Sequence, residues 1–174
     1  MCRYCREINR LRGKGGVGNI LISGNKIVLP KERSGPNAGR YTLFGGGREP
    51  EDGNCFLRTG FRELIQETSL LTPTEWNSLT RKQYRELFDA FYRPKGKPLK
   101  WFMLRSTVIL VCWLPAKYSV ADLNRRIMRA LHSNIPYCWR EISSCKAFTP
   151  KEIIDGPGTL ISAYAKIATL LYLN

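Results

Sequence analysis

Two glutamates lie four residues apart in the run Arg62-Glu63-Leu64-Ile65-Gln66-Glu67, and their type and spacing point to chemistry. On a helix, side chains at this spacing lie on neighbouring turns of one face, where two like charges repel each other. A divalent cation between them removes this repulsion, because carboxylate and carbonyl oxygens are hard ligands that suit Mg²⁺ or Mn²⁺. We therefore interpret Glu63 and Glu67 as candidate metal ligands, with the neutral side-chain oxygen of Gln66 on the same side.

A glycine-rich loop precedes this run and offers further oxygen atoms. The segment Gly45-Gly46-Gly47-Arg48-Glu49-Pro50 leads through Asp52-Gly53-Asn54 towards the two glutamates, and backbone carbonyls of such a loop are also hard ligands. Arg62 projects in a different direction from its neighbour Glu63, and we expect it to pair with a loop acid, Glu51 or Asp52. Asp52 or Asn54 is the expected N-cap of the helix that follows.

The segments that must hold these residues are strands before the loop and a helix after it. A strand over 18–23, a tight turn at Gly24-Asn25 and a returning strand over 26–30 form a predicted hairpin. A third short strand is expected over 40–44. Apolar residues at helical spacing predict a helix with one buried face that carries both glutamates: Leu57, Phe61, Leu64, Ile65 and Thr68.

The remaining chain mixes helices and strands without a regular order. Helices are expected over 73–91, 119–132 and 159–173, strands over 101–114 and 141–148, and a short turn or helix at 150–154. Because regular strand–helix–strand alternation is missing, the sequence predicts an α+β or sandwich-like fold rather than a doubly wound sheet. The last helix carries an apolar stripe, which is expected to face the core or an interface: Leu160, Ala163, Ile167, Leu170 and Leu171.

Length and charge limit the class of protein. The 174 residues fit a single domain over 1–174, in which residues 1–14 form a basic N-terminal extension. Twenty-eight Lys and Arg against 14 Asp and Glu give a net charge of +14, which favours an anionic partner such as nucleic acid, nucleotides or inositol phosphates. No apolar run approaches the roughly 20 residues of a membrane span, and no secretory leader is visible. The sequence therefore predicts an intracellular protein, cytoplasmic or nuclear, without a membrane partner.

In the loop and helix the chain resembles the Nudix hydrolase family. Arg62-Glu63-Leu64 matches the central Arg-Glu-apolar of the family's box, Glu67 matches the second Glu of its Glu pair, and Leu70 matches its last apolar position. The loop Gly45-Gly46-Gly47, with Tyr41-Thr42-Leu43-Phe44 before it and Glu49-Pro50 after it, is similar to the family's strand-to-glycine entry. The resemblance implies a Nudix-like α/β/α sandwich with a mixed sheet.

The box is degenerate. Gln66 stands in place of the first Glu of the pair, and Ser69 replaces the terminal Gly. One extra residue between Gly47 and Arg62 places Asn54 where the loop Glu of the family is expected. Because Gln66 is neutral, the site would hold one negative charge fewer, and its affinity for a metal ion is expected to fall.

The resemblance implies metal-assisted hydrolysis of a diphosphate linkage, with Mg²⁺ or Mn²⁺ as cofactor. Glu63 and Glu67 would be metal ligands, with the Gly47 carbonyl and Gln66 as weaker ones. Glu63 could instead accept the proton of the attacking water, and Glu141, from a later loop, is the candidate for a further catalytic base. Arg62 would hold the loop in place, and Arg48 would face the substrate phosphate.

Basic and aromatic residues are interleaved over 81–102, and this segment is a second candidate for substrate binding. Arg93, Lys95 and Trp101 are the residues that we select from it, because cations and stackable rings suit single-stranded RNA or a cap base. The alternative interpretation is that the rings belong to the core and the lysines to a solvated loop.

Two further motifs are weaker evidence for a binding site. Cys2-x-x-Cys5 has the spacing of a zinc site, for which His132, Cys138 and Cys145 are possible partners, but free thiols are the simpler interpretation. The run Gly13-Lys14-Gly15-Gly16-Val17-Gly18 does not fit a phosphate-binding loop, because a strand rather than a helix is expected to follow it.

The leading hypothesis is a pyrophosphohydrolase that cleaves a diphosphate linkage in a nucleoside-diphosphate-linked substrate. The basic charge favours capped RNA, whose 5′ cap some viral members of the family remove. The alternative substrate is a phosphate-rich small molecule such as ADP-ribose, a dinucleoside polyphosphate or an inositol polyphosphate. A hypothesis from another class is a catalytically weak Nudix-fold module that only binds a nucleotide or RNA.

Overall fold

The computed structural model describes residues 15–53 and 55–174. The basic extension over 1–14, the pair Cys2 and Cys5, and the candidate cap Asn54 lie outside the described residues.

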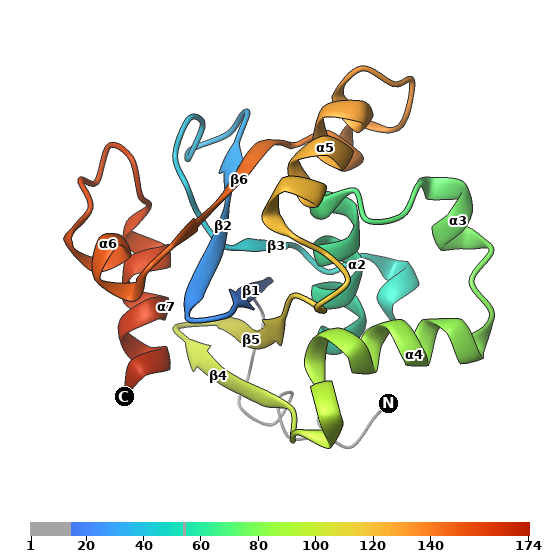
Figure 1. Cartoon of the computed structure of the whole chain (residues 1–174), viewed down its shortest axis with the longest axis horizontal. Coiled ribbons are helices and arrows are strands. Elements are labelled where there is room, and N and C mark those ends of the chain that lie inside the picture. The colour runs from blue at the N-terminus through green and yellow to red at the C-terminus, as the bar shows by residue number, and fades with distance from the viewer. Residues whose placement is uncertain (1–14, 54) are drawn as a thin grey trace.

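A mixed sheet forms the centre of the described structure (Figure 1). Its strands are β1 (Val17–Ser23), β2 (Lys26–Glu32), β3 (Phe44–Gly46), β4 (Lys100–Leu104), β5 (Thr107–Trp113) and β6 (Ile142–Phe148). They lie in the order β4-β5-β1-β2-β6, and β3 pairs with the first residues of β1. Strand β1 runs parallel to β5 and antiparallel to β2 and β3, which makes the sheet mixed.

Helices cover both faces of the sheet (Figure 1). On one face lie α2 (Phe56–Thr68), α3 (Pro73–Asn77), α4 (Arg81–Tyr92) and α5 (Val120–Leu131), and on the other lie α6 (Pro150–Asp155) and α7 (Ala163–Leu173). Side chains alternate along β1, so that Leu21 joins the first core while Ile20 and Ile22 join the second. This arrangement is the predicted α+β fold, an α/β/α sandwich with a mixed sheet.

Several predicted elements have other boundaries in the structure. The helix expected over 73–91 is two helices, because Thr72 caps α3 and Thr80 caps α4, and each side chain accepts a hydrogen bond from a backbone N–H of the next turn. The third strand begins at Phe44 rather than at residue 40, and α7 begins at Ala163 after the cap Ser162 rather than at residue 159. Three short 3₁₀ helices, η1 (Pro50–Asp52), η2 (Pro94–Gly96) and η3 (Tyr137–Trp139), complete the described elements.

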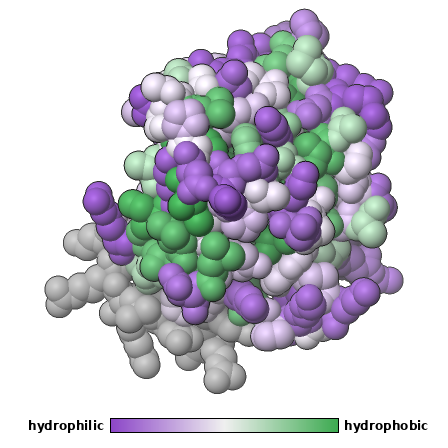
Figure 2. All heavy atoms as spheres, turned by 60° about the vertical axis from the view of Figure 1, so that its left-hand side comes forward, coloured by the Kyte–Doolittle hydropathy of each residue, from purple (hydrophilic) through white to green (hydrophobic). Residues whose placement is uncertain are grey.

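The apolar stripe of α7 faces outward. Leu160, Ile167, Leu170 and Leu171 are each between 37% and 44% exposed, whereas Ala165 and Ala168 are fully buried. Figure 2, in which the side that carries α7 comes forward, shows hydrophobic residues gathered on that face. The small residues of α7 therefore make its contact with the sheet. Of the two expected positions for the stripe, the core is wrong, and an interface stays a prediction.

No helix of the described residues is long and apolar enough to cross a membrane.

Candidate functional site

Helix α2 carries both candidate glutamates and is held tightly against the sheet. Gly60 lets it approach β1, because a Cβ there would lie 2.9 Å from a side-chain carbon of Val17. The buried amide of Asn19 donates a hydrogen bond of 3.0 Å to the Gly60 carbonyl and accepts one of 2.7 Å from the hydroxyl of Tyr92. These buried contacts fix the position of α2 relative to β1.

The helix does not begin on the predicted cap. Cys55 occupies the N-cap position, and its side chain accepts no capping hydrogen bond. The carboxylate of Asp52 instead accepts hydrogen bonds from the hydroxyl of Thr59 and the backbone N–H of Glu49, each 3.0 Å long. The acid expected to cap α2 thus ties the glycine loop to the first turns of the helix.

Glu67 lies beneath the glycine loop and is 6% exposed. Its Oε2 accepts a hydrogen bond of 2.7 Å from the backbone N–H of Gly45. Burial raises the pKa of Glu67 well above its usual value; the charges of Glu63, Glu141 and Glu32 raise it further, and the hydrogen bond from Gly45 only partly opposes them. Ionised Glu67 therefore lacks a sufficient counter-charge.

Glu63 lies one helical turn before Glu67 and is 8% exposed. Burial raises its pKa to about 7, although the guanidinium of Arg62, 2.9 Å from Oε1, acts in the opposite direction. The loop passes close to this carboxylate, since a Cβ on Gly46 would lie 2.6 Å from Oε1 of Glu63 and would displace it.

Arg62 joins the loop to the helix. Its guanidinium forms a two-point contact with Asp52, in which Nε donates to Oδ1 at 3.2 Å and Nη2 donates to Oδ2 at 3.0 Å. It also contacts Glu49 at 3.2 Å, whereas no ion pair of Arg62 involves Glu51 among the described residues. The prediction that Arg62 pairs with Asp52 is confirmed, and the alternative partner Glu51 is wrong.

The two weaker candidate ligands face Arg62 as well. The carbonyl oxygen of Gly47 accepts a hydrogen bond of 3.0 Å from Nη2, and the side-chain oxygen of Gln66 accepts one of 3.0 Å from Nη1. Arg62 therefore uses the oxygens that Gly47 and Gln66 were expected to offer to a metal ion. The carboxylates of Glu63 and Glu67 remain the main hard donors of the site.

Two further acids act electrostatically on the pair of glutamates. Glu141, just before β6, is half-buried and raises the pKa of both Glu63 and Glu67. Glu32, at the end of β2, is also half-buried and raises the pKa of Glu67. Sequence reasoning selected Glu141 but missed Glu32, because no spacing in the sequence relates β2 to α2.

The other predicted substrate residues lie in two places: Arg48 on the glycine loop, and the rest near the edge strand β4. Arg48 stacks over the ring of Phe56, 4.7 Å from its centroid, and Arg93 pairs with Asp89 at 3.8 Å. Lys95 lies in η2, and Trp101 lines a groove formed with residues of β5 and α7. Arg93, Lys95 and Trp101 thus gather near the edge strand β4, away from the loop and helix that carry Glu63 and Glu67 (Figure 1).

The donor set determines which ion fits. Among residues 15–53 and 55–174, no three or more His, Cys, Asp or Glu side chains form a ready-made metal cage, so His132, Cys138 and Cys145 do not converge on a zinc site there. The acidic cluster, defined here as Glu32, Glu63, Glu67 and Glu141, nevertheless places carboxylates close enough to raise one another's pKa. Buried, mutually repelling carboxylate oxygens suit a hard divalent cation such as Mg²⁺ or Mn²⁺.

No family model matches this chain, and no curated protein matches it. Several solved structures are similar. One is a bifunctional NMN adenylyltransferase/ADP ribose pyrophosphatase from Francisella tularensis, at 18% identity and a TM-score of 0.47 over 98% of this chain. The match spans only 46% of that longer protein.

Two further similar structures are named as NUDIX proteins. This is the family that the glycine loop and the helix after it resemble. The NUDIX domain of Shewanella oneidensis NrtR, complexed with ADP ribose, matches at 12% identity and a TM-score of 0.48, over 91% of this chain and 86% of that one. The MutT NUDIX hydrolase from Burkholderia pseudomallei matches at 16% identity and a TM-score of 0.41, over 90% of this chain and 95% of that one.

Proposed function

We propose that this chain is a divalent-metal-dependent pyrophosphohydrolase of the Nudix type, which cleaves a diphosphate linkage in a nucleoside-diphosphate-linked substrate. The observation that carries the proposal is the burial of Glu63 and Glu67, one helical turn apart, beneath the glycine loop and beside two more acids. Although the protein has a net charge of +14, Arg62 is the one residue of the described chain that forms an ion pair with the acidic cluster, at Glu63. Such a site costs stability without a further cation and is typical of a metal-binding function.

Mg²⁺ or Mn²⁺ held by Glu63 and Glu67 would neutralise charge on the phosphoryl oxygens and lower the pKa of a bound water. The protein's own residues account for the remaining requirements. In the alternative in which Glu67 alone holds the ion, Glu63 is available as the base, because a carboxylate with a pKa of about 7 can accept a proton near neutral pH. Glu141 is the second candidate base, because burial raises its pKa and it acts on both glutamates.

Arg62 is a positioning residue in this proposal. Its contacts with Asp52, Glu49 and the Gly47 carbonyl hold the glycine loop against α2 while its charge lies beside Glu63. A loop held in this way keeps the backbone N–H of Gly45 on Glu67. Arg48 lies on the same loop, half-buried over the ring of Phe56, and its guanidinium would have to turn away from that ring to reach a substrate phosphate.

We extend the proposal to the 5′ cap of mRNA as the substrate, because the positive charge of the chain favours a polyanion. ADP-ribose, dinucleoside polyphosphates and inositol polyphosphates are the alternative substrates. The contact between Gln66 and Arg62 favours a second candidate function, a nucleotide- or RNA-binding module, because it occupies the oxygen of Gln66 and leaves only Glu63 and Glu67 of α2 for a metal ion.

One assay separates these possibilities. The purified chain is incubated with Mg²⁺ or Mn²⁺ and capped RNA, ADP-ribose, a dinucleoside polyphosphate or an inositol pyrophosphate, beside the variants Glu67→Gln and Glu86→Gln. Glu86 is an exposed acid of α4, so its variant is a matched control for the loss of one charge. We expect product release that Glu67→Gln abolishes and Glu86→Gln leaves intact.

Other outcomes of this assay point elsewhere. Tight binding without turnover in every arm would support the binding module instead of the enzyme. Cleavage of free nucleotides with no cleavage of capped RNA would refute the cap as the substrate while leaving the pyrophosphohydrolase in place.

A further inference from the structure

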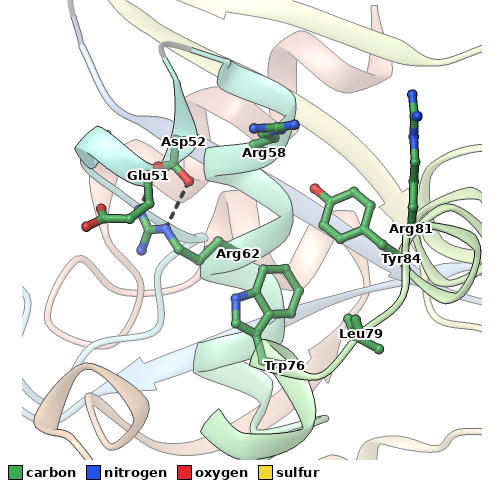
Figure 3. Close-up of a pocket in the computed structure, with 8 residues that line it drawn as sticks. All are labelled: Glu51, Asp52, Arg58, Arg62, Trp76, Leu79, Arg81 and Tyr84. Carbon is green, nitrogen blue, oxygen red and sulfur yellow. Dashed lines mark hydrogen bonds and ion pairs between the residues drawn. The ribbon is translucent and has the colours of Figure 1, made fainter.

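A cavity of about 410 Å³ lies between α2 and the helix pair α3–α4 (Figure 3). The ion pair of Arg62 with Asp52 forms one wall, and Trp76 of α3 and Tyr84 of α4 form the opposite side. This volume falls within the range of sites that bind small ligands. Glu63 and Glu67 do not line the cavity, so it is separate from the candidate metal site.

Two guanidinium groups on the cavity walls form no ion pair with any acid of the described residues. Arg58 projects from α2 and Arg81 from the first turn of α4, and both side chains are exposed. Within the described part of the chain neither forms an ion pair. The ion pair between Arg62 and Asp52 is internally balanced, which leaves Glu51 as the acid that partly offsets Arg58 and Arg81. The walls therefore carry a net positive charge suited to an anion.

Aromatic rings add a flat apolar surface beside these cations. Trp76 is half-buried and held edge-on by Phe61 at 5.6 Å and tilted against Tyr84 at 5.8 Å, measured between ring centroids. The side chain of Tyr84 points towards the α2 side of the cavity in Figure 3, and its hydroxyl makes no hydrogen bond to the described residues. A fixed indole face beside a phenol hydroxyl can contact a planar base and its ribose.

We propose that this cavity binds a nucleoside monophosphate unit, with its phosphate on Arg58 and Arg81 and its base against Trp76. Arginine forms two-point hydrogen bonds with phosphate oxygens, and aromatic rings stack on nucleobases of any sequence. The unit can be a free mononucleotide or one nucleotide of an RNA strand, because both present the same phosphate, ribose and base. This site goes beyond the proposed hydrolysis, since it needs neither Glu63 nor Glu67.

Arg62 nevertheless places the two sites next to each other. Its guanidinium lines the cavity through its contact with Asp52 and lies 2.9 Å from Glu63 on the other side. A nucleotide unit in the cavity would therefore lie beside the acidic cluster without using the oxygens of that cluster.

The test measures binding to the full-length chain in EDTA, so that hydrolysis and metal binding are both excluded. The probes are AMP and a 5′-phosphorylated oligouridylate. The variants are Arg58→Ala and Arg81→Ala, with Arg85→Ala as the matched control. Arg85 lies one turn after Arg81 on α4, is exposed and does not line the cavity, so its loss changes the net charge equally.

We expect Arg58→Ala and Arg81→Ala each to weaken binding about tenfold or more, the loss typical of a hydrogen bond to a charged group. Arg85→Ala should change it by less than about threefold, since a surface charge outside the cavity acts only through screened attraction. AMP binding with this pattern indicates a free mononucleotide. The same pattern with the oligouridylate alone indicates an RNA strand.

A second measurement locates the ligand. The chain contains four tryptophans, and we expect the indole N–H resonance of Trp76 to shift on titration with the probe that binds. Equal losses in all three arginine variants, no binding of either probe, or a shift confined to other indoles would overturn the proposal. Failure of hydrolysis alone would count only against the proposed function, because this assay contains no metal ion.

Discussion

Replacing Glu67 with glutamine should make the metal-free protein more stable while it abolishes metal-dependent activity. Glu67 is buried, and its charge is repelled by Glu63 one turn away on α2. Side chains at this spacing lie about 6 Å apart, and two unit charges at that distance repel by about 3 kcal/mol at an effective dielectric constant of about 20. Glutamine removes the charge and keeps an oxygen that can accept the hydrogen bond from Gly45.

Partial protonation of the pair reduces this repulsion, so we expect a net gain of about 2 kcal/mol in the free energy of unfolding. For a chain of this length the gain corresponds to a rise of roughly 4–8 °C in Tm. The assay is thermal unfolding in EDTA at a pH of about 8, where Glu63 with its pKa of about 7 is mostly ionised. Saturating Mn²⁺ should then raise the Tm of the wild type and leave that of Glu67→Gln nearly unchanged.

The control is Glu86→Gln, an exposed substitution that should change stability by less than about 0.5 kcal/mol. A Glu67→Gln variant that is less stable than the wild type in EDTA would refute the reasoning, because it would mean that the Glu67 carboxylate already has a sufficient counter-charge. An equal Mn²⁺ response in wild type and variant would place the ion elsewhere.

Three further predictions concern pH, the loop and α7. The pKa of Glu63 is raised from 4.5 to about 7, so the folded state binds its proton more tightly than the unfolded state; the contribution of Glu63 to stability, measured in EDTA as the difference in urea unfolding between wild type and Glu63→Gln, should be full below pH 4.5 and be lost as the pH rises through about 7. Asp52→Asn should cost about 3 kcal/mol in urea unfolding because it removes a buried partner of Arg62, and a loss below about 0.5 kcal/mol would contradict this. Leu170→Gln should change stability by less than about 0.5 kcal/mol, whereas Ala168→Leu should cost about 1–3 kcal/mol by overpacking; the reverse order would mean that α7 faces the sheet with its leucines.

Local patterns account for the elements that the sequence predicted well. The turn at Gly24-Asn25 joins β1 and β2 as expected, and the apolar spacing from Leu57 to Thr68 lies on α2, although the helix is buried on all sides except at Arg58 rather than on one face. Ser119 caps α5 at the start of the helix expected over 119–132. In each case the determining interactions connect residues a few positions apart, so the sequence contains them directly.

The orientation of α7 could not be predicted in this way. Hydrophobic spacing identifies a face but does not say whether that face meets the sheet, and here Ala165 and Ala168 make the contact. Small residues allow a close approach, and the large side chains of Ile167 and Leu170 remain outside.

The residues of the candidate site likewise differ in whether local spacing in the sequence could identify them. Glu63 and Glu67 were recognisable because one helix carries both. Glu32 reaches them only through the order of the strands, because β2 lies between β1 and β6 in the sheet. The contacts of Arg62 with Gly47 and Gln66 depend on how the loop folds over α2, and residue types alone do not determine that path.

The distribution of charge also bears on how a substrate reaches the site. A diphosphate has the same sign as the acidic cluster, so it is repelled from Glu63 and Glu67 until a cation offsets them. The net charge of +14 acts at longer range and draws the same diphosphate towards the molecule. The substrate is therefore attracted to the protein surface with or without a metal ion, but it reaches the acidic cluster only when an ion is bound there. We expect the metal ion concentration to control turnover more strongly than it controls binding of the substrate to the surface.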